Sequence, residues 1–315
     1  MKSILDPVVL FFILGSIAGI VKSDLRVPQS FYNTISIYLL LSIGIKGGIE
    51  LYHSEVSNIL FPIFITLLLG ACTTLIAHFI LRKTKKFNTY DAISIATHYG
   101  SVSAVTFAVV LSYLKTREIT YEKYMTVLLV MLEIPALITG VFLAQSISNK
   151  PGKKLPEVLK EVFLGKSILL IVGGLLIGYA IGYTNNKQIN FFFFDLFKGF
   201  LCLFMLEMGI ITSERFKDLK KVGITLILFG TAMPIISACL GIATAIMADL
   251  SEGGAIVFAT MAASASYIAA PAAMKIALPQ ANVTYSLTAA LGITFPFNII
   301  VGIPLYSVLA HYIYL

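Results

Sequence analysis

Two short segments place glycine, serine and alanine in the middle of otherwise apolar stretches. Residues 98–109 read HYGSVSAVTFAV, and residues 263–274 read ASASYIAAPAAM. Both segments carry hydroxyl groups and small side chains, and neither carries Lys or Arg at its centre. Where a helix is interrupted at such a point, the free amide groups of the new helix attract an anion, and the free carbonyl groups of the preceding one suit a cation. The chemistry that these residues indicate is therefore the binding of small ions by backbone and hydroxyl groups.

The two segments also correspond at a fixed spacing in the sequence. Ser266 lies 165 residues after Ser101, and the same shift aligns Ala104 with Ala269. A single segment of this kind is more often a surface for close helix packing, because small residues let two helix backbones approach. Two copies at matching positions, one of them containing Pro271, favour a duplicated transport site instead.

Pro271 predicts where the second interruption ends. Proline has no amide hydrogen and suits the first turn of a new helix, so a half-helix is expected to start near Ala270–Pro271. By the 165-residue shift, the corresponding half-helix is expected to start near Val105–Thr106.

The composition excludes a soluble globular domain. The chain is 58% hydrophobic and 12% charged, with a mean hydropathy of +0.91, whereas soluble proteins carry about 25% charge. The lipid bilayer is therefore its expected surroundings. The net charge of +7 does not indicate nucleic-acid binding, because the basic residues form short runs between apolar stretches.

Stretches of about 20 apolar residues predict an all-α integral membrane protein with ten transmembrane helices, of which the fourth and ninth are broken. The expected helices cover residues 4–21, 31–49, 57–81, 90–114, 123–147, 163–184, 192–212, 221–248, 253–277 and 285–312. A polar linker, residues 151–165, separates helices 1–5 (1–150) from helices 6–10 (166–315). Because five is odd, the second half enters the bilayer from the opposite side, so the two repeats are inverted.

Lysine and arginine predict the orientation of the chain. They are more frequent in the connections after odd-numbered helices, which places those connections in the cytoplasm. A multi-pass protein of the cell membrane (plasma or inner) with both termini outside is expected.

Few polar groups lie deep in the other helices. Glu133 is about ten residues inside its segment, roughly 15 Å along the helix, and the 165-residue shift aligns it with Asn298. A carboxylate at that depth is either a functional group or a partner in a helix–helix hydrogen bond. Asp195 and Lys198 are three residues apart, a spacing that predicts an ion pair.

The sequence contains no catalytic or nucleotide-binding signature. HExxH, GxSxG, paired aspartates and the phosphate-binding GxxxxGK pattern are all absent from it, so neither an enzyme nor an ATP-driven pump is indicated. A secondary transporter that uses an ion gradient, with no cofactor besides the coupling ion, is the remaining common class.

The motifs HYGSVSAVTFAV, SASYIAAPAAMKIALPQAN and GITFPFNIIVGIPLY resemble the sodium-dependent bicarbonate transporter family, best known from cyanobacteria, and LLSIGIKGGIEL and LFMLEMGI are similar to it as well. The resemblance covers nearly all of the chain. It implies ten helices in inverted repeats, a mobile core domain and a gate domain that both draw on the two repeats, and a homotrimer. It also implies symport of sodium with bicarbonate, with the anion held between the two breaks.

The resemblance assigns site residues by motif. The anion candidates are Gly100, Ser101, Val102, Ser103, Ala269 and Ala270. The sodium candidates are Ser103, Thr106, Thr260, Ser264, Ser266, Glu133 and Asn298.

Two features depart from the family pattern. The linker between the halves is much shorter than the cyanobacterial one, which helps bind a PII-like regulator, so that partner is not expected here. His98, beside the first break, is either a packing residue or a source of pH sensitivity and altered anion choice.

The sequence thus predicts a sodium-coupled symporter that imports bicarbonate by alternating access of the elevator type. Two alternatives stay open: a sodium-coupled transporter of another small anion, such as a carboxylate or sulfate, and a passive anion channel.

Overall fold

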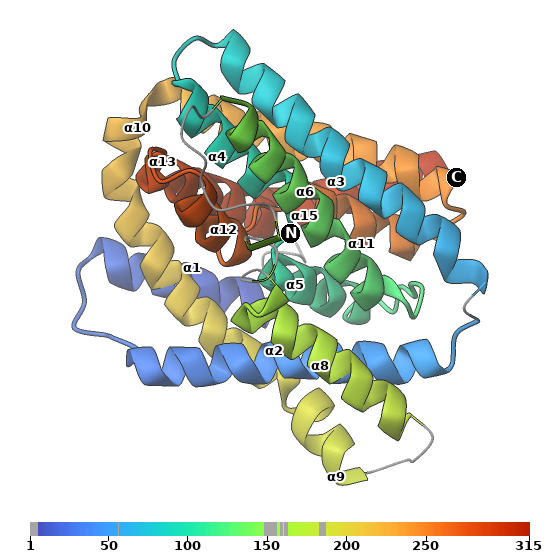
Figure 1. Cartoon of the computed structure of the whole chain (residues 1–315). Helices are drawn as coiled ribbons and strands as arrows, with labels where there is room; N and C mark the ends of the chain where they lie inside the picture. The colour runs from blue at the N-terminus through green and yellow to red at the C-terminus, as the bar shows by residue number, and fades with distance from the viewer. Residues whose placement is uncertain (1–5, 56, 148–155, 158–159, 161–162, 183–186) are drawn as a thin grey trace.

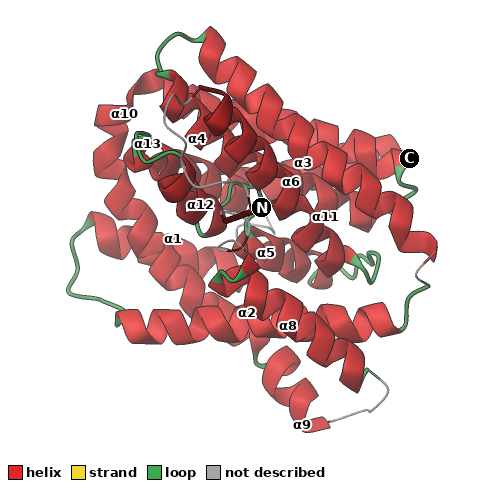
Figure 2. Ribbon diagram, viewed as in Figure 1, coloured by secondary structure: helices red, strands yellow, loops and turns green. Residues whose placement is uncertain are grey.

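Every regular element in the described part of the chain is a helix, as Figure 2 shows. The computed structural model describes residues 6–55, 57–147, 156–157, 160, 163–182 and 187–315. Most of the predicted linker 151–165 lies outside these residues.

The helices of the N-terminal half follow the predicted segments closely. They are α1 (Pro7–Ile20), α2 (Gln29–Tyr52), α3 (Ser57–Lys83), α4 (Thr89–Gly100), α5 (Ala104–Lys115) and α6 (Met125–Ile147). Asp6 caps the first of them, because its carboxylate accepts a hydrogen bond from the amide of Val8 at 2.9 Å.

The C-terminal half contains helices of more varied length. They are α8 (Lys166–Ile181), α9 (Lys187–Asn190), the π-helical η1 (Phe191–Asp195), α10 (Phe197–Met247), α11 (Glu252–Ala263), α12 (Ala269–Ala277), α13 (Val283–Leu287), η2 (Thr288–Thr294), α14 (Phe295–Phe297), η3 (Asn298–Gly302) and α15 (Ile303–Tyr314). The last five run on without a gap, so the final predicted segment is one helical stretch with two π-helical parts.

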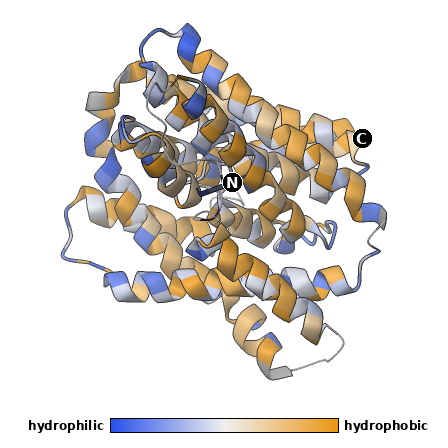
Figure 3. Cartoon of the chain, in the orientation of Figure 1, coloured by the Kyte–Doolittle hydropathy of each residue, from blue (hydrophilic) through white to orange (hydrophobic). Residues whose placement is uncertain are grey.

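Helices long and apolar enough to cross a membrane make this a multi-pass membrane protein. Six such stretches occur in the described residues: Gln29–Tyr52, Asn58–Lys83, Thr89–Lys115, Met125–Ile147, Val222–Met247 and Val283–Tyr314. Large apolar side chains on their outer faces are exposed, such as Leu60 (64%) and Phe142 (68%), which suits contact with lipid. Figure 3 shows hydrophobic residues along most of the helices, and hydrophilic residues in the loops, at helix ends and within α10.

The boundary expected between residues 212 and 221 is absent, because α10 continues through it. The intervening residues SERFKDLK are mostly good helix formers, and Arg215 and Asp218 approach to 3.8 Å one turn apart. The direction changes instead at Gly223, whose φ of 77° is a conformation that favours glycine. The two parts of α10 consequently run in different directions (Figure 1).

Two helix pairs pack with unusually close backbones. A Cβ on Gly15 of α1 would lie 1.9 Å from the carbonyl oxygen of Leu206 on the first part of α10. A Cβ on Gly48 of α2 would lie 2.1 Å from the carbonyl oxygen of Leu175 on α8. Glycine is therefore required at both crossings, as in other tightly packed membrane helices. The 165-residue shift relates the two pairs, since it carries α2 onto the first part of α10 and α1 onto the region of α8.

The remaining helices form a second group. α3 packs against α4 and α6, and the second part of α10 packs against α11 and η2. These two triplets also correspond under the shift, and α5 and α12 lie where the two groups of helices meet.

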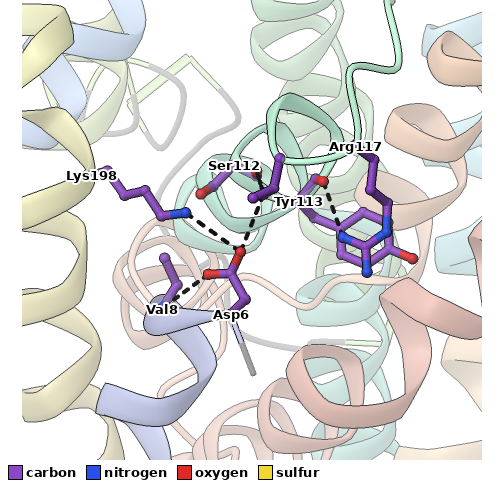
Figure 4. Close-up of polar contacts among 7 residues, drawn as sticks. Asp6, Val8, Ser112, Tyr113, Arg117 and Lys198 are labelled. Carbon is purple, nitrogen blue, oxygen red and sulfur yellow. Dashed lines mark hydrogen bonds and ion pairs between the residues drawn. The ribbon is translucent and has the colours of Figure 1, made fainter. Parts of the chain in front are cut away.

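The ion pair expected between Asp195 and Lys198 is replaced by another. The Nζ atom of Lys198 lies 3.5 Å from Oδ2 of Asp6, which also accepts a hydrogen bond from the Thr116 hydroxyl at 3.2 Å. Figure 4 shows Asp6 and Lys198 pointing toward each other. The carboxylate thus connects the starts of α1 and α10 to the end of α5, a contact that spacing along one helix could not predict.

Candidate ion-binding site at the crossing of two helix breaks

The first break separates α4 from α5 by residues 101–103. The amide of Ser101 donates to the carbonyl oxygen of Thr97 at 3.3 Å and closes the last turn of α4. The Ser103 hydroxyl accepts from the amide of Thr106 at 3.2 Å and caps α5. The predicted interruption is therefore present, and α5 begins at Ala104, one residue before the expected start.

The second break separates α11 from α12 by residues 264–268. The Ser264 hydroxyl donates to the carbonyl oxygen of Met261 at 2.8 Å, and the Ser266 hydroxyl accepts from the amide of Ala270 at 3.3 Å. Pro271 is the third residue of α12, where a helix needs no amide donor. This interruption is also present, and α12 begins at Ala269, again one residue before the expected start.

The two breaks bind each other directly. The amide of Ser103 donates to the Ser264 hydroxyl at 2.9 Å, and the amide of Ser266 donates to the carbonyl oxygen of His98 at 2.8 Å. Each break thus satisfies part of the polar backbone of the other. Non-helical backbone at membrane depth requires such partners, because lipid provides none.

A small cavity of about 20 Å³ lies beside the crossing. Five of its lining residues carry side-chain oxygens, and they come from four different helices or breaks: Ser103, Glu133, Ser167, Ser266 and Tyr267. Val102, Ala104, Leu129, Ile171 and Ile268 complete the wall. The volume holds one object the size of a water molecule, and oxygen atoms are the ligands that hard cations prefer.

Glu133 gives this cavity its only acidic group among the described lining residues. It is 7% exposed, and no described side chain or backbone group forms a hydrogen bond or ion pair with it. A buried carboxylate without a partner is costly in the membrane interior. A cation in the cavity would supply the missing counter-charge.

The other predicted sodium ligands lie outside the cavity wall. Asn298 donates to the carbonyl oxygen of Ala263 at 2.9 Å and accepts from the Tyr306 hydroxyl at 2.7 Å. Both ends of its amide are used by protein groups, so Asn298 fixes the end of α11. The Thr260 hydroxyl donates to the carbonyl oxygen of Ile256, and Thr106 is 1% exposed within α5.

The predicted anion residues lie in two places: at the end of α4 with the first break, and in the first turn of α12. A Cβ on Gly100 would lie 1.8 Å from Oγ1 of Thr74, so this glycine permits the close approach of α4 to α3. Ser101 is 1% exposed, and its hydroxyl has no hydrogen-bond partner among the described residues. Ala269 and Ala270 form the first turn of α12.

The first turn of α5 has more unpaired amide donors than the first turn of α12. The amides of Ala104 and Val105 donate to no other described group, and Ala104 lines the cavity. In α12, the amide of Ala270 is already bonded and Pro271 has none, which leaves the amide of Ala269. Free amides at a helix start carry partial positive charge and bind anions without a basic side chain.

Sequence reasoning missed two polar groups of the cavity. Ser167 lies on α8 at the start of an apolar segment, and no local pattern distinguishes it. Tyr267 lies within the second motif, and its position between Ser266 and Pro271 could have marked it. The hydroxyl oxygens of both residues are buried without a hydrogen-bond partner in the described part of the chain.

His98 is buried beside the crossing. Its Nδ1 lies 2.7 Å from the carbonyl oxygen of Ser94, and since a carbonyl only accepts, Nδ1 carries a proton. Nε2 has no partner among the described residues. The imidazole ring of His98 therefore bonds within α4, and the backbone carbonyl of His98 accepts the hydrogen bond from the second break.

These features define a class: a helical multi-pass membrane protein with a small cavity, partly lined by side-chain oxygens, at two interrupted helices, as in secondary transporters. A family model described as the Na+-dependent bicarbonate transporter superfamily matches residues 7–311. The chain therefore belongs to that superfamily. No curated protein matches it closely enough to add a relative.

Proposed function

We propose that the protein is a symporter that imports bicarbonate together with sodium by alternating access. The observation that carries this proposal is the crossing of the two breaks beside an oxygen-lined cavity that contains the unpartnered Glu133. Family membership supports sodium and bicarbonate as the transported ions.

Sodium binds first in this scheme. The carboxylate of Glu133 and the oxygens of Ser103 and Ser266 are the nearest set of hard ligands in the cavity wall. Thr106, Thr260, Ser264 and Asn298 surround the breaks and hold their shape. Because the cation would neutralise the buried carboxylate, its arrival lowers the cost of bringing an anion to the same site.

Bicarbonate then binds at the first turn of α5. The free amides of Ala104 and Val105 and the unpartnered hydroxyl of Ser101 are its donors, with Ala269 contributing from α12. The cavity of about 20 Å³ holds one water-sized object, so it has to widen to admit an anion with four non-hydrogen atoms. A widening of this kind is expected when one group of helices moves past the other.

The arrangement of the helices suits an elevator motion. Under the proposal, the gate consists of α1, α2, α8 and the first part of α10, and the core consists of the triplets around α4 and α11. The correspondence of the two pairs and the two triplets under the 165-residue shift supports inverted repeats. A homotrimer in the cell membrane with both termini outside completes the proposal, without a PII-like regulator.

The test is uptake of labelled bicarbonate into proteoliposomes that contain the purified protein, with and without an inward sodium gradient. Uptake that rises with the gradient and is blocked by unlabelled bicarbonate supports the proposal. Stronger competition by sulfate or a small carboxylate would assign another anion. Uptake that ignores the sodium gradient would indicate a passive channel. Liposomes without protein give the background.

A further inference from the structure

We propose that a lysine-lined chamber between the gate and the core collects small anions before they reach the crossing of the breaks. This inference deepens the proposed function and rests on it for the direction of transport. It concerns a second cavity, of about 350 Å³, which is much larger than the one at the breaks. Lys46 of α2, Lys115 of α5 and Lys198 of α10 line it, together with Ser42 and Asp195.

The three ammonium groups are not equally free. Nζ of Lys46 lies 3.6 Å from Oε1 of Glu50 and donates to the Tyr121 hydroxyl at 3.0 Å. Lys198 pairs with Asp6, as described above. Lys115 has no ion-pair or hydrogen-bond partner for its side chain among the described residues, and its side chain is exposed. Lys115 is therefore the cation best placed to hold a mobile anion.

The nearby charges do not cancel this arrangement. Asp195 is the one acidic residue among the described lining groups, and the carboxylates of Asp6 and Glu50 are engaged by Lys198 and Lys46. Arg117 stacks on the ring of Tyr113, with Cζ 3.5 Å from the ring centroid, and donates to the carbonyl oxygen of that residue (Figure 4). Arg117 is thus held away from the chamber wall.

A third cavity adjoins both this chamber and the cavity at the breaks. This third cavity, of about 10 Å³, shares Ile43 with the chamber and shares Ala104 and Ile268 with the cavity at the crossing. Apolar residues such as Leu39 and Phe204 make up nearly all of its described lining. The chamber and the third cavity both have lining residues from α2 and α5, and α5 also contributes Ala104 to the cavity at the crossing.

In this proposal, the chamber and the cavity at the breaks act at successive stages of anion capture. The breaks contain no Lys or Arg, and partial charges on amides act over short distances only. Full charges on flexible lysines act over a Debye length of about 8–10 Å and raise the local anion concentration. Their ligand is a small hydrated anion that is held loosely enough to move on.

A tryptophan in the chamber wall tests this directly, because the chain has no tryptophan of its own. Phe194→Trp places one fluorophore in the lining. We expect iodide to quench its fluorescence at least about threefold more effectively than caesium, and bicarbonate to reduce the iodide effect. Adding Lys115→Gln to this variant is expected to lower the iodide quenching constant about two- to fivefold.

The matched control removes the same charge elsewhere. Lys83 at the end of α3 lies over the ring of Phe79, and Lys83→Gln on the same background is expected to leave quenching unchanged. Equal quenching by iodide and caesium, or equal effects of the two Lys→Gln changes, would overturn the inference.

Transport gives a second readout. Lys115→Gln is expected to raise KM for bicarbonate about two- to fivefold with Vmax unchanged, and added salt should erase the difference. A fall in Vmax at constant KM would contradict a collecting role. Because the quenching assay needs no transport, anion-selective quenching with no bicarbonate uptake would retain the chamber and refute the proposed function.

Discussion

The two breaks match in sequence and differ in structure. The first spans three residues, 101–103, all of them buried, and ends in a serine cap on α5. The second spans five residues, 264–268, includes the 37% exposed Ile268, and leads into α12 without a side-chain cap at its N-cap residue.

The difference extends to the backbone amides that are proposed to bind the anion. Two first-turn amides of α5 are free, whereas bonding and a proline leave one in α12. A duplicated motif therefore does not produce two equal half-sites. The first break leaves two free amides and the second leaves one, and each break satisfies different backbone groups of the other.

Substitution of the aligned serines gives the largest expected effect. Ser101 and Ser266 are 1% and 2% exposed, so Leu at either position fills space that the ions need. Sodium-driven bicarbonate uptake should fall by at least about 100-fold for Ser101→Leu and for Ser266→Leu, while size-exclusion chromatography shows a folded protein. Ser101→Ala is the size control, and normal sodium-driven uptake by Ser101→Leu would refute the site.

The aligned pair Glu133 and Asn298 should separate function from stability. Glu133→Gln loses no described partner, so thermal stability should hold while sodium stimulation of uptake falls about tenfold or more. Asn298→Ala leaves the Ala263 carbonyl and the Tyr306 hydroxyl unpaired, which should cost about 1–3 kcal/mol of stability. Thermal unfolding in detergent and sodium titration of uptake measure the two effects. The opposite pattern would make Asn298 the ion ligand.

The third comparison is between the residues that precede the two half-helices. Ser103→Ala removes the cap of α5 and should lower stability by about 1 kcal/mol, with a clear rise in KM. Its aligned partner Ile268 makes no cap, and Ile268→Ala should change stability by about 0.5 kcal/mol or less. The thermal unfolding midpoints of the two variants are compared with that of the wild type to measure these stability changes. Equal losses would mean that the breaks are equivalent after all.

Among these variants, Pro271→Ala should have the smallest effect on uptake. Proline restricts the unfolded chain, so its removal should lower stability by about 0.4–1 kcal/mol, and the uptake rate should stay within about twofold. Thermal unfolding in detergent and sodium-driven bicarbonate uptake measure the two effects. A much greater loss of uptake would show that the missing amide at this position is itself needed for anion binding.

The sequence predicted much of the local structure because local rules decide it. Runs of apolar residues placed most of the helices, and small residues with Pro271 placed the starts of α5 and α12 to within one residue of the expected ranges. The continuous α10 was missed because residues 213–220 are charged, which resembles a loop between membrane helices but also suits a helix. The glycine that turns the chain lies just beyond them, at Gly223.

The candidate site was predicted in part. Ser103 and Ser266 could be found from the motif, and Glu133 from its depth, and all three line the cavity. Ser167 could not be found, because its role depends on α8 packing beside the breaks. The pairing of Lys198 with Asp6 was missed for the same reason, since 192 residues separate the two partners.

The sequence by itself determined that the chain is a helical membrane protein, where two of its helices are interrupted, and to which family it belongs. Hydrophobic length, proline and small residues act within one or two helical turns, so their consequences can be predicted locally. Only the tertiary structure decided that the breaks bind each other, that Asn298 is held by protein groups, and that three lysines from different helices line one chamber. Those outcomes depend on which distant helices pack together. A polar group gains or lacks a hydrogen-bond partner according to the helix packed against it, and its neighbours in the sequence do not decide this.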